Sequence, residues 1–473
     1  MKKFTLLCLA LLTIQSSLSQ TTEKNRVIIL SDIEADPDDT QSFVRLFLYA
    51  NEIDIKGIVA TTSCWMQTTI NPNSIEKIVD AYGKIQPNLL KHQKDYPSAE
   101  ALRSIIKEGL PKYGMTGVGD GMDSEGSDWI ISELEKDDDR PLWISVWGGV
   151  NTLAQSLHKI KNTKSIKDAK KLISKLRVYT ISDQDDSGLW IRNNFPDVFY
   201  IVSPGDNYED ATWTGVNTFI KGIDNTTISN EWLADNIQQN HGPLGAIYPD
   251  VAWGVEGDTP AFLSLIPNGI NESEHPNRGS WGGRYELYKP DFSKTKKGNS
   301  IVEIGAEKRA IWTNAIDNYT PHIPSKYGRS VKPDSTSFTG FKETLWRWRD
   351  DFNNDFAARM DWCTMSFENA NHPPVPVLSH PQEFEVKSGQ AFTLDALDST
   401  DPDGDNLSFL WFHYPEESSY KEKINLGADN VHIVHATAPK VTKKETLHFI
   451  LKVTDKGSPA LSRYKRVIVT VTP

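Results

Sequence analysis

Five short apolar segments alternate with amphipathic segments over the first two hundred residues, and this alternation constrains the fold more than any other feature. We expect strands at residues 26–30, 55–61, 142–146, 177–181 and 198–202. We expect helices at residues 40–50, 74–85, 98–108, 127–135 and 152–160. Such alternation predicts an α/β fold, with a mostly parallel sheet flanked by helices.

A proline-rich segment, residues 369–376, predicts a domain boundary because it suits neither a helix nor the interior of a sheet. Short alternating strands follow, at residues 383–386, 392–395, 408–413, 432–435, 447–455 and 466–471. They predict an Ig-like β-sandwich. We therefore expect an α/β domain over 24–368 and a sandwich over 374–473. The acidic turn 398–405 is an Asx-type turn or a calcium site.

Two parts of the predicted α/β domain break the alternation. Residues 265–335 are rich in Gly, Asn, Pro and Lys, and predict long irregular loops. Residues 337–360 predict one helix whose aromatic side chains belong mostly to the core.

The first residues predict a cleaved signal peptide, residues 1–19. Lys2 and Lys3 precede a short apolar core over 4–14, and small residues lead to a cut near Gln20. No later segment predicts a membrane span. We therefore expect a periplasmic or secreted protein. Two cysteines remain after cleavage, Cys64 and Cys363, and the sequence leaves their pairing open.

The charge balance narrows the class of partner. The chain has 63 acidic and 51 basic side chains, a net charge of −12. Nucleic acid is a poor partner for such a chain, since phosphates call for basic patches. An oligo- or polysaccharide substrate suits it better, and a homo-oligomer stays possible. No Gly-x-Ser-x-Gly elbow, His-Glu-x-x-His zinc motif or phosphate loop occurs in the sequence.

Residues 32–39 place five acids directly after the first predicted strand, namely Asp32, Glu34, Asp36, Asp38 and Asp39. Acids at the carboxyl end of a strand lie where α/β folds bind ligands. Their mutual repulsion is relieved by protonation or by a divalent cation, and oxygen ligands favour calcium or magnesium. A helix N-cap with a dipole-stabilised first turn explains the last three acids, but it leaves the first two unexplained.

This acidic turn resembles the amino-terminal signature of nucleoside hydrolases, Asp-x-Asp-x-Gly-x-Asp-Asp. Residues 148–154 resemble their second motif, Gly-Pro-Leu-Thr-Asn-Leu-Ala. More closely, the chain is similar to a bacterial family of secreted proteins labelled cellulose-binding, which joins a nucleoside-hydrolase-like domain to a cadherin-like sandwich. Residues 241–245, 256–260 and 281–286 carry that second resemblance.

The resemblance implies a calcium ion at the floor of a sugar pocket. Asp32 would be a ligand and the general base, and Asp39 a bidentate ligand. Asn151 would donate its backbone carbonyl, and Asp38 would hold a sugar hydroxyl. The last ligand of the parent family has no clear match, and we assign it to Asp258, with Glu256 as the alternative.

The sequence departs from the parent pattern at the acidic turn and at the second motif. Glu34 replaces the second Asp of the signature, and Asp36 replaces its Gly. The order of Asn151 and Thr152 inverts the parent Thr-Asn pair. These changes question nucleoside specificity more than metal binding.

Further polar and aromatic side chains are predicted to contact substrate. Residues 182–188 follow a predicted strand and reach the same rim, or form a solvated acidic loop. Trp190 is a sugar platform or a core residue, and His241 is an acid for the leaving group or a structural histidine. The predicted contacts are Asp183, Asp186, Trp190, Asn193, His241, Glu256, Trp281 and Arg284.

These patterns favour an exported, calcium-dependent enzyme that hydrolyses a glycosidic bond in an oligo- or polysaccharide. Asp32 and Asp38 are its predicted catalytic residues. The alternatives are a periplasmic nucleoside hydrolase, a non-catalytic polysaccharide-binding protein, and a sugar lyase or dehydratase.

Overall fold

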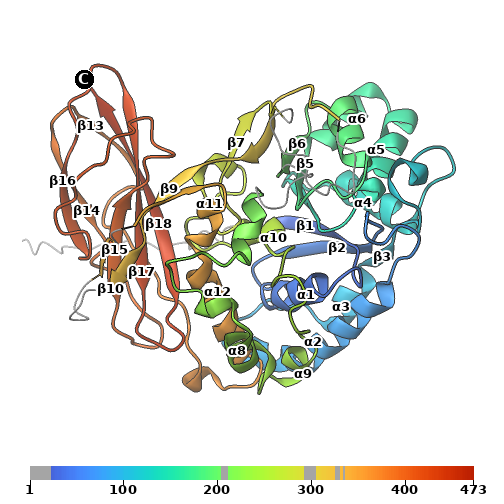
Figure 1. Ribbon diagram of the computed structural model, residues 1–473, viewed down its shortest axis with the longest axis horizontal. Coiled ribbons are helices and arrows are strands. Elements are labelled where there is room, and N and C mark those ends of the chain that lie inside the picture. The colour runs from blue at the N-terminus through green and yellow to red at the C-terminus, as the bar shows by residue number, and fades with distance from the viewer. Residues whose placement is uncertain (1–22, 204–210, 292–304, 325–330, 334–335) are drawn as a thin grey trace, which may run out of the picture.

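The computed structural model describes residues 23–203, 211–291, 305–324, 331–333 and 336–473. The predicted signal peptide therefore lies outside the described residues. Figure 1 shows an α/β domain beside an all-β domain that contains the C-terminus. Both predicted architectures are confirmed.

An eight-stranded sheet forms the centre of the α/β domain. Its strands are β1 Arg26–Ser31, β2 Asp54–Ala60, β3 Ile106–Glu108, β4 Leu142–Val146, β5 Leu176–Thr180, β6 Phe199–Val202, β7 Tyr285–Tyr288 and β8 Ile311–Asn314. They lie in the order β3-β2-β1-β4-β5-β6-β8-β7, and neighbours are parallel except that β7 runs antiparallel to β8. The chain adds β2 and β3 on one side of β1 and then continues with β4 on the other. This reversal creates a switch point, where open α/β sheets bind ligands.

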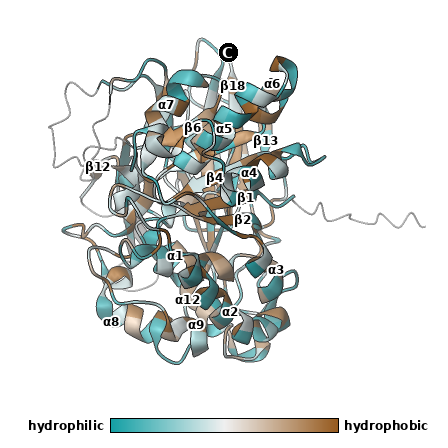
Figure 2. Ribbon diagram, turned by 90° about the vertical axis from the view of Figure 1, so that its right-hand side faces the viewer, coloured by the Kyte–Doolittle hydropathy of each residue, from teal (hydrophilic) through white to brown (hydrophobic). Residues whose placement is uncertain are grey.

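Helices cover both faces of this sheet, so the central strands are mostly apolar, as Figure 2 shows by the largely brown colour of β1, β2 and β4. The helices are α1 Asp38–Leu48, α2 Pro72–His92, α3 Ala99–Ser104, α4 Glu125–Glu135, α5 Asn151–Thr163, α6 Ile166–Ser174, α7 Ser187–Asn194, α8 Asn230–Leu233, α9 Gly242–Ala246, α10 Pro260–Leu263, α11 Glu343–Trp346 and α12 Arg349–Asp361. Val27 and Ile29 face a core shared with α1, α2 and α12, and Ile28 and Leu30 face a core shared with α4 and α5.

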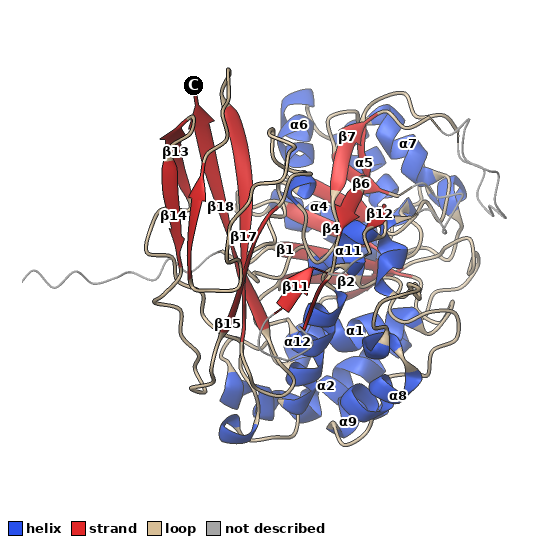
Figure 3. Cartoon of the chain, turned by 60° about the vertical axis from the view of Figure 1, so that its left-hand side comes forward, coloured by secondary structure: helices blue, strands red, loops and turns tan. Residues whose placement is uncertain are grey.

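The C-terminal domain packs a four-stranded sheet against a two-stranded one (Figure 3). The strands are β13 Glu383–Lys387, β14 Ala391–Asp395, β15 Ser408–His413, β16 Ile433–Thr437, β17 Glu445–Thr454 and β18 Ser462–Thr472. The larger sheet has the order β13-β18-β17-β15, so β13 and β15 are its edges, and β14 pairs with β16. The core between them includes Trp411, Phe449 and Val469.

Three predicted elements differ from the structure. The helix predicted at 98–108 ends early, because the chain turns into β3 and pairs with β2. The helix predicted at 337–360 is divided into β12 Phe338–Gly340, α11 and α12. The region 265–335, predicted as loops, supplies β7 and β8 to the main sheet, together with β9 Asp317–Tyr319, β10 His322–Pro324 and β11 Val331–Pro333.

Helix α12 lies between the sandwich and α1 (Figure 1). Asp355 on this helix accepts hydrogen bonds from Tyr49 at 2.7 Å and from Arg463 of the sandwich at 2.6 Å. Within the described ranges, no helix is long and apolar enough to cross a membrane. Cys64 and Cys363 are both buried free thiols, so they are not paired.

Candidate functional site

The acidic turn lies at the switch point, directly after β1. The amide of Ala35 donates to the carbonyl of Asp32 at 3.0 Å and closes a tight turn. Glu34 at the tip is exposed, has a left-handed backbone conformation with φ 79°, and does not line the cavity described below. The amide of Asp38 donates to Oδ1 of Asp36 at 3.0 Å as α1 begins. The turn therefore directs its aspartates inward, while Glu34 stays outside.

Four aspartates of this turn meet Asp258 around a cavity of about 70 Å³. Asp32, Asp39 and Asp258 are 4%, 2% and 4% exposed. Asp36, Asp38 and Asp39 each have an oxygen within 4.8 Å of the others' oxygens. We call this space the acid cavity. Its lining consists of Asp32, Ala35, Asp36, Asp38, Asp39, Trp65, Trp147, Ile181, Ser182, Gln184, Trp213 and Asp258.

Asp258 reaches the acid cavity because its neighbour Glu256 is fixed against α1. Arg45 donates Nε to Glu256 at 2.5 Å, and Tyr248 donates its hydroxyl at 2.8 Å. Gln41 accepts the backbone amide of Glu256 at 2.8 Å. Glu256 is thus a buried support rather than a ligand. Among the described residues, Oδ2 of Asp258 is buried and has no hydrogen-bond partner.

Close backbone contacts complete the walls. A Cβ on Gly148, after β4, would lie 2.6 Å from Oδ1 of Asp32. A Cβ on Gly257 would lie 2.5 Å from Oδ2 of Asp38. Each distance is shorter than atoms tolerate, so a Cβ at either position would displace the facing aspartate. Asp39 is further fixed by the hydroxyl of Ser31, which donates to it at 2.5 Å.

The electrostatics of the acid cavity are unbalanced. Burial raises the pKa of Asp32 to about 6, and the charge of Asp36 adds to the effect. Burial also raises the pKa values of Asp38, Asp39 and Asp258 well above the usual range, and their repulsion of one another raises them further. Lys and Arg are missing from the described lining. These carboxylates therefore have no positively charged partner in the described lining of the cavity.

A divalent cation would fit this arrangement. The donor set consists of carboxylate oxygens, which hard cations such as calcium prefer. Asp258 also offers a buried oxygen that no described donor satisfies, and such an oxygen is costly unless it is paired. Asp32, Asp39 and Asp258 are the residues that would hold the ion, and Asp38 lines the same cavity beside them.

Several predicted site residues lie outside the acid cavity. Asn151 directs its side chain to Thr61, at 2.9 Å, and to the carbonyl of Lys112, at 2.7 Å. Asp183 forms a buried ion pair with Arg192 at 2.7 Å. Asp186 accepts the amide of Met115 at 2.8 Å. Asp183 and Asp186 thus have structural partners. The role predicted for Asn151 uses its backbone carbonyl and stays a prediction.

The aromatic and basic candidates also have structural partners. Trp281 is fully buried against Phe352 and Tyr464, so it offers no face to a sugar. Arg284 donates to Asp317 at 2.6 Å. His241 lies 3.2 Å from Asp361. We therefore correct these three assignments.

The candidates on α7 also lie apart from the acid cavity. Trp190 packs edge-on against Phe195, and Asn193 is exposed. Neither of them lines the acid cavity.

The sequence interpretation missed three tryptophans that line the cavity. Trp65 lies at the mouth and is 54% exposed, whereas Trp147 is fully buried. Trp213 donates Nε1 to Ser182 at 3.2 Å. Trp65 and Trp147 both follow the carboxyl ends of strands, β2 and β4, and this position was a usable signal. Trp213 follows no strand end in that way.

Comparisons with known proteins agree with this architecture. Residues 26–285 match the family "Cellulose-binding Sde182, nucleoside hydrolase-like domain", and residues 391–471 match "Cellulose-binding protein Sde0182, C-terminal domain". A solved structure from Saccharophagus degradans is described as a nucleoside hydrolase-related hypothetical protein associated with carbohydrate metabolism. It is 35% identical, with a TM-score of 0.78, and the match covers 95% of this chain and 100% of that one.

Two solved structures of effector proteins match this chain at much lower identity. The effector XOO4466 is 9% identical with a TM-score of 0.37, and the match covers 72% of this chain and 94% of that one. The type III effector XopQ, solved with adenosine diphosphate ribose, is 10% identical with a TM-score of 0.34. The match covers 72% of this chain and 95% of that one. No curated protein matches this chain.

Proposed function

This chain belongs to the cellulose-binding Sde182 family with a nucleoside-hydrolase-like domain, and we propose that it is an exported enzyme that hydrolyses a glycosidic bond in an oligo- or polysaccharide. We propose calcium as its cofactor. The observation that carries the proposal is the convergence of Asp32, Asp38, Asp39 and Asp258 on one small cavity, whose described lining contains no Lys or Arg. Binding alone gives no reason to collect repelling carboxylates in a cavity this small.

Each carboxylate has a distinct role in this proposal. Asp32 is the general base and takes a proton from the attacking water. Asp39, oriented by Ser31, and Asp258, supported through Glu256, are ligands. Asp38, at the start of α1, holds a hydroxyl of the sugar. A bound divalent cation supplies a lowered pKa for water and a fixed orientation for hydroxyls.

The size of the acid cavity bears on how the substrate binds. A water molecule occupies roughly 30 Å³ of liquid, so about 70 Å³ accommodates an ion and one or two waters. Pockets that enclose small-molecule ligands occupy about 300–1,000 Å³. The sugar must therefore lie at the mouth, where Trp65 is exposed and offers a stacking face. An exposed site of this kind suits a polymer better than an enclosed nucleoside.

The test is the mass of the products formed from cello-oligosaccharides in the presence of calcium. Hydrolysis adds one water per cleaved bond. Asp32→Asn should lower kcat by about 10²–10⁴, since it removes a general base. Equal rates in wild type and Asp32→Asn, both with a chelator and with calcium, would refute the proposal.

The same experiment separates the alternatives. Release of free base from inosine would favour nucleoside hydrolysis. The sequence speaks against this alternative, because Asp36 occupies the glycine position of the parent signature. Loss of water without cleavage would indicate a dehydratase. Cleavage that leaves an unsaturated sugar would indicate a lyase. Retention on insoluble polysaccharide without any soluble product would identify a non-catalytic binder.

A further inference from the structure

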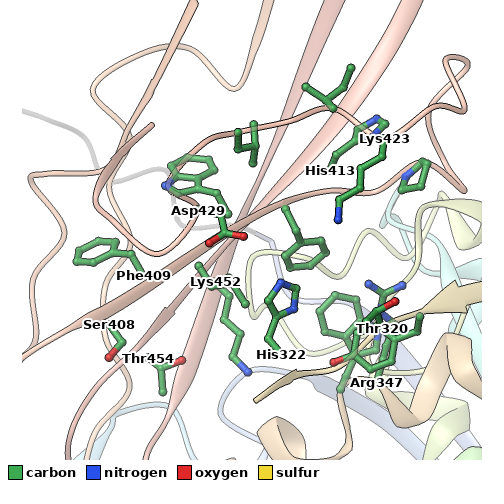
Figure 4. A pocket seen from close by; sticks show the side chains of 18 of the residues that line it. Thr320, His322, Arg347, Ser408, Phe409, His413, Lys423, Asp429, Lys452 and Thr454 are labelled. Atoms are coloured by element: carbon green, nitrogen blue, oxygen red, sulfur yellow. The ribbon is translucent and has the colours of Figure 1, made fainter. Parts of the chain in front are cut away.

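A second and much larger cavity separates the two domains, and it shares no lining residue with the acid cavity. Its volume is about 740 Å³, within the range of small-molecule sites. One wall is β15, an edge strand of the sandwich, with the loop 423–429. The other wall is formed by β9, the start of β10 and the junction of α11 and α12. We call it the interdomain cleft (Figure 4).

Direct bonds between the domains fix both walls. Tyr414 donates its hydroxyl to Asp317 at 2.6 Å, and Lys452 pairs with Asp351 at 2.5 Å. Asp317 also pairs with Arg347 at 2.9 Å, and both of these residues lie on the wall opposite Tyr414. Because these partners are buried or partly buried, they hold the domains in one relative position. The cleft is therefore pre-formed, which lowers the cost of binding a ligand.

The lining combines ring faces with hydrogen-bonding groups. Phe412 is half-buried and packs 6.2 Å from Trp348 and 6.4 Å from His322, between ring centroids. Burial lowers the pKa of His322, so its neutral ring offers one donor and one acceptor. Figure 4 shows His322, Lys423, Asp429 and Lys452 extending into the same space. Ring faces and mixed donors and acceptors match a sugar, which has apolar faces edged by hydroxyls.

The charges in the cleft favour a neutral ligand. Arg347 and Lys452 are neutralised by Asp317 and Asp351. Among the described residues, four lining groups remain without an ion pair, and they are two cations and two anions: Lys423, Lys456, Glu416 and Asp429. Their formal sum is zero, so neither a polyanion nor a polycation gains net attraction.

We propose that the interdomain cleft binds a short neutral oligosaccharide. The occupant lies along β15 and contacts the ring of Phe412, while Lys423 and Asp429 bind its hydroxyls. This inference does not depend on the proposed catalysis, since it uses none of the aspartates of the acid cavity.

The experiment is isothermal titration of the full chain with cellohexaose in EDTA, which prevents the proposed calcium-dependent hydrolysis, at low and at high salt. The double variant Lys423→Ala/Asp429→Ala keeps the net charge, and its lost side chains have no hydrogen-bond or ion-pair partner in the described part of the protein. Two lost charge-assisted hydrogen bonds should raise Kd at least about ten-fold. The matched control is Glu383→Ala/Lys387→Ala, two exposed residues on β13 at the opposite edge of the same sheet. It should bind like wild type.

Two further arms make the result specific. His322→Ala should raise Kd for cellohexaose by about ten-fold. The wild-type Kd should vary little with salt, as expected for a neutral ligand. Three outcomes would overturn the proposal: no binding of cellohexaose, equal Kd in wild type and the double variant, or tighter binding of hexagalacturonate than of cellohexaose.

Discussion

Replacing Asp32 by Asn should stabilise the metal-free protein and destabilise the calcium-loaded one. Burial and the charge of Asp36 raise the pKa of Asp32 from its usual 3.8 to about 6. Below pH 3.8 the carboxyl is protonated in both states and contributes nothing. Between pH 3.8 and 6 the unfolded chain releases the proton while the folded chain keeps it, so stability falls as pH rises. Above pH 6 the loss is complete.

The magnitude follows from that shift. A rise of roughly two pKa units at 1.36 kcal/mol per unit costs the metal-free protein about 3 kcal/mol at pH 7. The Asp32→Asn variant avoids this cost in the metal-free state, because its amide carries no charge. With calcium at 1,000 times Kd, wild type gains about 4.1 kcal/mol, and the variant loses most of this gain because it lacks one ligand. The order of stabilities of the two proteins therefore reverses when calcium is added.

The assay is denaturant unfolding of wild type and Asp32→Asn at pH 4 and pH 7, in EDTA and in calcium. Asp139→Asn is the control, since Asp139 is exposed and makes no hydrogen bond or ion pair among the described residues. The difference between wild type and variant should be small at pH 4 and should reach about 3 kcal/mol at pH 7 in EDTA. A variant less stable than wild type at pH 7 in EDTA would refute the argument that the carboxylates of the acid cavity repel one another without compensation.

Three further substitutions test the walls of the acid cavity, the support that Glu256 gives to Asp258, and the contact between the two domains. Gly148→Ala places a methyl 2.6 Å from Oδ1 of Asp32 and should abolish the calcium-induced rise in Tm, whereas a normal response would contradict the close contact. Glu256→Gln leaves Arg45 buried without its anion and should cost about 3–5 kcal/mol in denaturant unfolding, and a cost below about 1 kcal/mol would exclude this role. Arg463→Met removes one buried partner of Asp355 and should cost a similar amount, measured the same way, and an unchanged Tm would argue against a fixed domain contact.

Local sequence patterns predicted the acidic turn well but could not complete it. Asp32, Asp38 and Asp39 lie in eight residues after an apolar strand, and that position alone indicated a site. Asp258 is 219 positions beyond Asp39, and the contacts of Glu256 with Arg45 and Gln41 of α1 bring it back. No local pattern reports such a contact, so the assignment of Asp258 rested on resemblance.

The same limit explains the wrong assignments. From the sequence alone, Arg284 and Asp183 could each bind a ligand. In the structure both are buried, and Arg284 pairs with Asp317 while Asp183 pairs with Arg192. Those pairs satisfy charges that would otherwise be costly to bury. Because a sequence lists charges without their partners, it cannot distinguish a structural ion pair from a binding group.

Helix α12 shows why the two domains depend on one another. Its residues Asp351 and Asp355 are buried and bind the sandwich, while Asn353 accepts a hydrogen bond from Arg45 at 2.8 Å. The helix therefore has no single apolar face, which is why its residues supported only an imprecise helix prediction. Arg45 in turn holds Glu256, two residues before Asp258. The sandwich thus contributes to the order of the acid cavity through α12, even though it supplies no residue to its lining.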